Sequence, residues 1–244
     1  MILRSSYFML RRMSRGYLAL IILLFLPLAL ITVLGMVAGD VVDPQLNIPV
    51  MDGIAVTMIL AFQLYGGFYT MEFIRYDLMS STKWRMYALP YQVHQHAFSI
   101  ILSCTLFSAF QGLVMVLFTQ WVYGVHWGNI GLVFLVLLAI SILSQLVFLN
   151  LVLGVKHYKT AEGLGTVYGI TSIALAGVWF PMPESGILNF LSTYASPLAL
   201  GQNAVYALII GENVDQVILS IGILLAASGA MAVIAVLLGR RKLA

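Results

Sequence analysis

Hydrophobic residues fill long stretches of this chain, and polar residues gather in the short gaps between them. A helix needs about 20 mostly apolar residues to cross the hydrocarbon core of a bilayer. Six stretches reach or approach that length. We therefore predict an all-α integral membrane fold, a single transmembrane domain over residues 1–244, with spans at 17–38, 53–73, 97–119, 130–153, 163–180 and 216–238.

The composition supports this fold class. The chain has 244 residues, of which 61% are hydrophobic and 9% are charged, whereas soluble domains carry about 25% charged residues. The formal net charge of +3 is too small and too scattered for nucleic-acid binding. The single cysteine, Cys104, falls inside an apolar run and cannot form a disulfide within the chain.

Charged residues alternate between the gaps. All 12 Lys and Arg residues lie before the first span, between the second and third, between the fourth and fifth, or after the sixth. The other three gaps contain no Lys or Arg. Because cytoplasmic segments are enriched in Lys and Arg, we expect both termini to be cytoplasmic in a multi-pass protein of the cell membrane.

Residues 1–16 form a basic amphipathic segment. Leu3, Tyr7 and Leu10 repeat at helical spacing among four arginines, so we expect a helix in the cytoplasmic interface of the membrane. The alternative is a secretory signal peptide. The apolar run that follows is longer than the 7–15 residues typical of such a peptide.

A polar segment, residues 75–90, separates the second and third spans. Ser80 or Ser81 can cap a short helix, and Pro90 would end it. Apolar side chains at helical spacing alternate with basic ones in this segment: Trp84, Met86, Tyr87 and Leu89 with Lys83 and Arg85. We predict a surface helix here; the alternative is an ordinary loop with interfacial anchors.

Two glycine pairs have the four-residue spacing that lets membrane helices approach closely, namely Gly35 with Gly39 and Gly165 with Gly169. They indicate either packing within one chain or contact with a second copy.

The gap between the fifth and sixth spans contains two short apolar runs. Ser196 followed by Pro197 predicts the start of the second helix. Neither run is long enough to span a bilayer, so we expect a re-entrant outer hairpin or a cap on the bundle.

The sequence contains no phosphate-binding loop, His-Glu-x-x-His zinc pair or Gly-x-Ser-x-Gly nucleophile elbow. His94 and His96 are two residues apart, so they point in different directions on a helix and indicate an interfacial pair rather than a metal site. No span carries a charged residue at mid-membrane depth, which argues against an ion-coupled carrier or a proton channel. We therefore expect no catalytic residue, metal or cofactor in this chain.

Uncharged polar residues do lie at depth. Gln63 and Thr70 share a face of the second span, and Ser108 and Gln111 lie in the third. These four residues are candidates to line a pathway for an amphipathic or lipid-like substrate. The alternative is hydrogen bonding between helices, which contributes about 0.6 kcal/mol per bond in lipid.

Specific motifs occur at the fifth span and the outer hairpin: Ala176-Gly177-Val178-Trp179-Phe180-Pro181-Met182, then Leu188-Asn189-Phe190-Leu191 and Tyr194-Ala195-Ser196-Pro197-Leu198. This arrangement resembles the membrane subunit of ABC-2 type exporters. The cluster of Glu72, Arg75 and Asp77, followed by a helix ending at Leu89-Pro90, resembles the coupling helix of that family, and the amphipathic start resembles its elbow helix. One departure is that residues 91–96 contain no Lys or Arg, which the family often carries there.

The resemblance implies a half-transporter. Two such membrane subunits, identical or paralogous, would pair around a pathway in the membrane lipid, and two separate ABC ATPase chains would supply ATP and Mg. The residues that would couple to the ATPase are Arg75, Asp77, Lys83, Trp84, Arg85 and Tyr87. The resemblance also implies export, with a drug, antimicrobial peptide or other amphipathic substrate, and a role in resistance or immunity in a bacterial cell membrane.

Three alternatives remain open. A polysaccharide or lipid exporter belongs to the same class. An intramembrane enzyme would need nucleophile, base or metal ligands at one depth, and the sequence contains no such cluster. A substrate-capture subunit of an importer would need neither the polar segment at 75–90 nor the amphipathic start.

Overall fold

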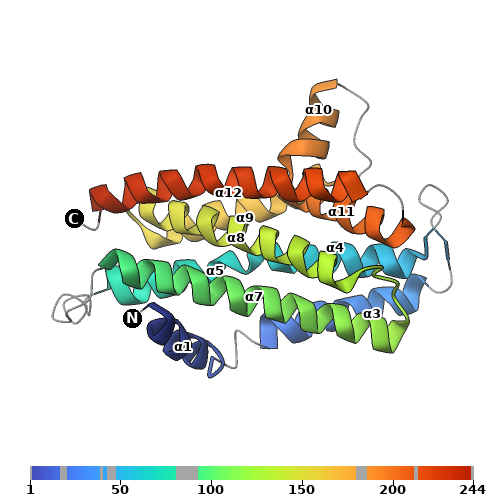
Figure 1. Cartoon of the computed structure of the whole chain (residues 1–244), viewed down its shortest axis with the longest axis horizontal. Helices are drawn as coiled ribbons and strands as arrows, with labels where there is room; N and C mark the ends of the chain where they lie inside the picture. Colours follow the sequence, from blue (N-terminus) through green and yellow to red (C-terminus); the bar gives the residue numbers. More distant parts are fainter. Residues whose placement is uncertain are drawn as a thin grey trace.

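The computed structural model describes residues 2–16, 21–38, 41–42, 48–80, 93–179, 186–211 and 214–242, and nearly all of them are helical. The long helices lie side by side in an elongated bundle, and both termini lie at the same end of it (Figure 1). The described residues form no strand, which confirms the all-α fold class.

Five helices within the described ranges are long and apolar enough to cross a membrane. They correspond to the first four predicted spans and the sixth. The first, Ile21–Ala38, consists of the π-helical turn η1 (Ile21–Phe25) and α3 (Leu26–Ala38), and the second, Val50–Met79, consists of α4 (Val50–Tyr65), α5 (Gly67–Ile74) and the π-helical turn η2 (Arg75–Met79). The other three are single helices: α7 (Val93–Tyr123), α8 (Ile130–Gly154) and α12 (Val214–Lys242).

The predicted fifth span, 163–180, corresponds to α9 (Tyr158–Leu175). This helix begins earlier than predicted and includes Lys159 and Glu162 in its first turns. It is long enough to cross a membrane but less apolar than the five helices above. The sixth span therefore stays a prediction.

Helix α8 lies at the centre of the bundle and packs against α4, α5, α7, α9, α11 and α12. One apolar core joins α8 to α3, α4, α7, α11 and α12. A second core joins α8 to α1 (Ile2–Met13), α5, α7 and the last turns of α12. This second core lies toward the end of the bundle that carries the termini.

The segment between α9 and α12 forms two different structures. Helix α10 (Gly186–Phe190) and the π-helical turn η3 (Leu191–Ala195) project from the bundle, whereas α11 (Pro197–Ile210) packs into it (Figure 1). Ser196 Oγ accepts a hydrogen bond from Ala199 N at 3.3 Å, which confirms the predicted helix start. The re-entrant position of this segment in a membrane stays a prediction.

Helix α1 packs along α7 and buries Ser6, Met9 and Met13. Leu3 and Tyr7, which belong to the predicted membrane-facing side, are exposed on the outside of the bundle. That exposure leaves them available to a membrane interface, although the interfacial position itself stays a prediction.

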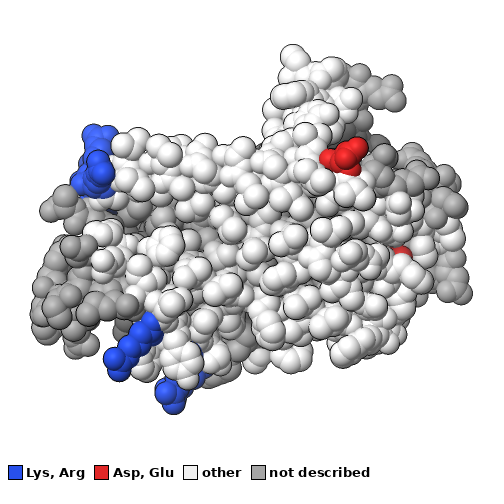
Figure 2. All heavy atoms as spheres, viewed as in Figure 1, with Lys and Arg blue, Asp and Glu red and all other residues white. Residues whose placement is uncertain are grey.

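Charge separates along the bundle. On the face that Figure 2 shows, Lys and Arg lie toward the end that carries the termini, and Asp and Glu lie toward the other end. We name the end with the termini the basic end. This separation is what the alternation of charged gaps predicts for a bundle of spanning helices.

Candidate functional site

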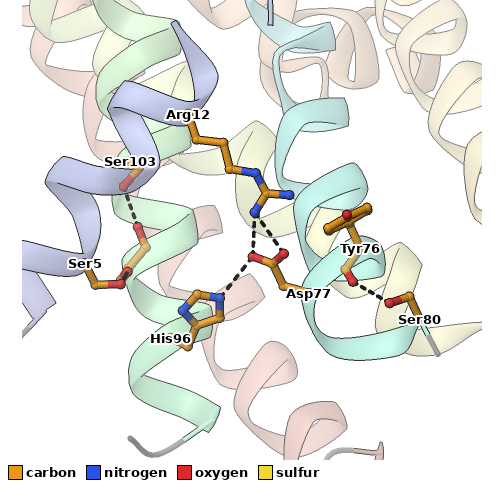
Figure 3. Close-up of polar contacts among 8 residues, drawn as sticks. Ser5, Arg12, Tyr76, Asp77, Ser80, His96 and Ser103 are labelled. Atoms are coloured by element: carbon orange, nitrogen blue, oxygen red, sulfur yellow. Dashed lines mark hydrogen bonds and ion pairs between the residues drawn. The ribbon is translucent and has the colours of Figure 1, made fainter. Parts of the chain in front are cut away.

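Three helical segments meet at the basic end around the carboxylate of Asp77 (Figure 3). Arg12 Nη1 from α1 lies 2.9 Å from Asp77 Oδ1, and His96 Nε2 from α7 lies 3.1 Å from Asp77 Oδ2. The Asp77 side chain, in η2, is only 10% exposed. Hydrogen bonds to an ionised group are about twice as strong as neutral ones. The carboxylate therefore joins α1, the second span and α7, and we name Arg12, Asp77 and His96 the junction.

Two aromatic rings of the second span position the guanidinium of Arg12. Its Cζ atom lies 5.0 Å from the ring centre of Phe73 and 4.8 Å from that of Tyr76. Both distances are within the range of a cation–π interaction, about 6 Å. Arg12 thus contacts the second span through its charge and through two rings.

Serine contacts extend the junction along α7. Ser99 Oγ donates to Ser5 Oγ at 2.9 Å, and Ser103 Oγ donates to the carbonyl of Ser6 at 3.2 Å. The Ser6 hydroxyl in turn donates to the carbonyl of Ser99 at 3.4 Å. These bonds hold α1 against the first turns of α7.

Arg75 connects the second span to α9. Its guanidinium carbon lies 3.9 Å from the ring centre of Tyr158, the first residue of α9. Of the predicted coupling residues, Arg75 and Asp77 therefore contact different neighbours. The other four, Lys83, Trp84, Arg85 and Tyr87, lie outside the described residues.

The junction flanks the segment in which those four residues lie. The turn η2 leads into that segment and ends at Met79; the hydroxyl of the next residue, Ser80, donates to the carbonyl of Tyr76 at 2.7 Å. Helix α7 begins directly after the segment, at Val93. Residues 81–92 thus connect η2 to α7 along the chain, and Asp77 of η2 contacts both α7 and α1.

The second span is interrupted between α4 and α5. Ser144 Oγ from α8 accepts a hydrogen bond from Gly67 N at 3.0 Å and donates to the carbonyl of Leu64. A side chain inserted into the backbone ladder is a recognised cause of a helix kink. A Cβ atom at Gly67 would collide with Phe148 and with Ser144, so glycine is required for this approach. We name Gly66, Gly67 and Ser144 the hinge.

All four predicted pathway residues are buried. Gln63 Nε2 donates to Ser141 Oγ of α8, and Thr70 Oγ1 donates to Gln145 Oε1 of α8 at 2.6 Å. Ser108 and Gln111 lie on α7, facing the same region of the bundle. The contacts of Gln63 and Thr70 are hydrogen bonds between helices, and the pathway role of all four residues stays a prediction.

Three of the four paired glycines, Gly35, Gly165 and Gly169, pack within the chain. A Cβ atom at Gly35 would meet Met51, one at Gly165 would meet Phe148, and one at Gly169 would meet Tyr65. Gly39 lies outside the described residues. Contact of these glycines with a second copy stays a prediction.

Sequence reasoning did not find Arg12, His96 and Tyr158 as partners of the second span. A signal was present, because Arg12 and Asp77 have opposite charge and fall on the same predicted side of the membrane. Within the described ranges, no group of three or more His, Cys, Asp or Glu is placed to hold a metal ion.

Comparison with known proteins identifies the family. The sequence profile of the ABC-2 type transporter family matches residues 4–210, which is most of the chain. No curated protein and no solved structure matches the chain. Members of this family are transport permeases that generally work with ABC ATPase subunits. The chain belongs to the ABC-2 type transporter family and is a membrane permease component of an ABC transporter.

Proposed function

We propose that this chain is the permease subunit of an ATP-driven exporter and that a separate chain binds and hydrolyses the ATP. The observation that carries the proposal is the junction. Its carboxylate, Asp77, lies within the predicted coupling segment, residues 75–90, and contacts α1 through Arg12 and α7 through His96.

In this proposal an ATPase chain docks at the basic end against residues 81–92. Closure of the ATPase pair on ATP displaces η2 and the start of α7, and Asp77 transmits that displacement to Arg12 on α1. The contact of Arg75 with Tyr158 transmits it to α9. ATP can drive this change only if the ATPase contacts one state of the permease more favourably than the other.

The hinge gives the second span a place to bend. In this proposal α4 stays in the first apolar core, while α5 and η2, which pack in the second core, change their angle at Gly66 and Gly67.

Two such permeases, identical or paralogous, pair in the cell membrane, and two ATPase chains dock beneath them. Both termini are cytoplasmic because the basic end faces the cytoplasm. The substrate is a drug, an antimicrobial peptide or another amphipathic molecule, since the polar groups at depth are uncharged and are surrounded by apolar side chains.

A mild-detergent pull-down of the tagged chain from its native host tests the ATPase partnership. We expect an ATPase with a phosphate-binding loop to co-purify in about a one-to-one ratio. Recovery of the chain alone, or only with further copies of itself, would contradict the proposal.

The coupling role needs a second experiment on the same complex. Trp84→Ala or Arg85→Ala should leave ATP hydrolysis intact and reduce transport. The transported molecule in this assay is one that co-purifies with the complex or one found by screening candidate substrates. Trp121→Ala is the matched control, because Trp121 is an exposed tryptophan near the opposite end of α7. Full transport by both coupling variants would refute the role of this segment.

A further inference from the structure

An apolar groove of about 910 Å³ runs along the flank of the bundle between α7, α8 and α12. Its volume is within the range of ligand pockets, about 300–1,000 Å³. Leu102, Ile142 and Leu149 are among the apolar residues that line it, and Ala232 forms part of the α12 wall. The groove is open to the side, since Val236 on its rim is 55% exposed.

The polar side chains of the groove are unevenly distributed. His94 and Arg240 line it at the basic end, and Thr105 is the remaining polar side chain of the lining. Nearby, Lys242 Nζ donates to the carbonyls of Val152 and Val155, which fixes the end of α12 against α8. The guanidinium of Arg240 forms no ion pair with any described residue. The Arg240 side chain is exposed and lines the mouth of the groove.

The length of the groove matches one leaflet of a bilayer. From His94 to Leu106, α7 rises by roughly 18 Å at about 1.5 Å per residue. Half of the hydrocarbon core of a bilayer is about 15 Å thick. A ligand with its charged group at Arg240 would thus extend its apolar part to about the middle of the membrane.

We propose that this groove binds an anionic phospholipid of the leaflet at the basic end. Its phosphate contacts Arg240 and His94, and an acyl chain lies along the apolar wall of α7, α8 and α12. A free phosphate would leave the apolar wall unused. A zwitterionic headgroup would bring a second cation close to Arg240. The site lies on the flank of the bundle, apart from the buried polar residues of the proposed pathway.

Lipid retention tests the headgroup contact without any ATPase, so its outcome is independent of the proposed transport function. The full chain is reconstituted in nanodiscs with equal amounts of phosphatidylglycerol and phosphatidylcholine and released into mild detergent. Retained lipids are then counted by native mass spectrometry. The wild-type chain should retain phosphatidylglycerol preferentially.

The variant Arg240→Gln should lower that retention about fivefold, because one Arg near an anionic surface contributes about 1 kcal/mol. Arg241→Gln is the matched control, since Arg241 is the adjacent exposed arginine and does not line the groove. An equal decrease in both variants would indicate diffuse surface charge and overturn the proposal. Unchanged retention in Arg240→Gln, or equal retention of the two lipids by the wild-type chain, would overturn it as well.

A second pair of variants tests the acyl-chain contact. Ala232→Trp fills the groove while Arg240 is kept, and it should abolish retention of both lipids. Ala230→Trp places the same side chain on the exposed face of α12, outside the groove, and should behave as the wild-type chain. If Ala232→Trp retains lipid at the wild-type level, the acyl chain lies outside this groove and the proposal is overturned. A cross-link from Val236→Cys to a second copy in the nanodisc would show that protein, and not lipid, covers the groove.

Discussion

Removal of the Asp77 carboxylate tests the junction directly. The ion pair joins a side chain that is 10% exposed to an Arg12 side chain that is 43% exposed. Exposed pairs contribute about 0.2–1 kcal/mol, and hydrogen bonds to charged groups contribute about 1.5–3 kcal/mol. Because water can solvate the half-exposed guanidinium after the carboxylate is lost, we expect the coupling free energy between Arg12 and Asp77 to be about 1 kcal/mol.

Docking of α1 can be measured by the labelling of a buried thiol. Ser6 lies on the face of α1 that packs against α7 and is 5% exposed, so Ser6→Cys reacts with a maleimide only when α1 leaves α7. The background variant Cys104→Ala removes the single native cysteine. Where opening and closing are fast, the labelling rate follows the opening equilibrium. If the free energy that docks α1 against α7 falls by about 1 kcal/mol, the labelling rate then rises about fivefold.

A double-mutant cycle in this background isolates the pair. Arg12→Ala should raise the labelling rate about fivefold, and Asp77→Ala should raise it at least as much because the contact between Asp77 and His96 is lost as well. The double variant should label more slowly than the sum of the two single effects predicts, because each single variant already loses the ion pair. It should still label faster than Asp77→Ala alone, because it also loses the contacts of Arg12 with the rings of Phe73 and Tyr76. Arg11→Ala, at the exposed neighbouring arginine, is the control and should have no effect. Additive effects of Arg12→Ala and Asp77→Ala would refute the ion pair as the link between α1 and the second span.

Three further substitutions test the bundle through its unfolding free energy in detergent. Ser144→Ala should lower that free energy by about 1 kcal/mol, because the hinge loses its buried donor and acceptor. Its control, Ser228→Ala, removes a hydrogen bond only within its own helix and should have a smaller effect. Gly169→Leu should destabilise by about 1–3 kcal/mol through collision with a tyrosine ring of α4, whereas Gly222→Leu enters open space. Ser196→Ala should cost about 1 kcal/mol through loss of the α11 cap. A denaturant titration measures all three, and equal losses in variants and controls would contradict the contacts described.

The helical bundle was predictable from sequence because its signals are local. Apolar runs of spanning length, and the grouping of Lys and Arg in alternate gaps, depend only on neighbouring residues. The start of α11 was predictable for the same reason, since Ser196 and Pro197 act on the first turn of their own helix. The fifth span was less clear because Lys159 and Glu162 join the start of α9 to a polar gap.

The partners of the candidate site were not predictable in this way. Asp77 stood out as an acid in a basic segment, but its pairing with Arg12 depends on how α1 folds back along α7. The sequence around Ser144 does not distinguish it from other serines of the apolar runs, and only the approach of α8 to Gly67 shows that it occupies the break in the second span. Contacts between residues far apart in the chain depend on packing, which periodicity does not specify.

The central claim is that an ATPase acts on this permease at its basic end. Photo-cross-linking in the native host tests it with a photoreactive residue at position 83, in the predicted coupling segment, or at position 215, at the start of α12 on the opposite end. We expect an adduct with a phosphate-loop ATPase from position 83 and none from position 215. An ATPase adduct from position 215, or from neither position in a complex shown to contain the ATPase, would contradict it.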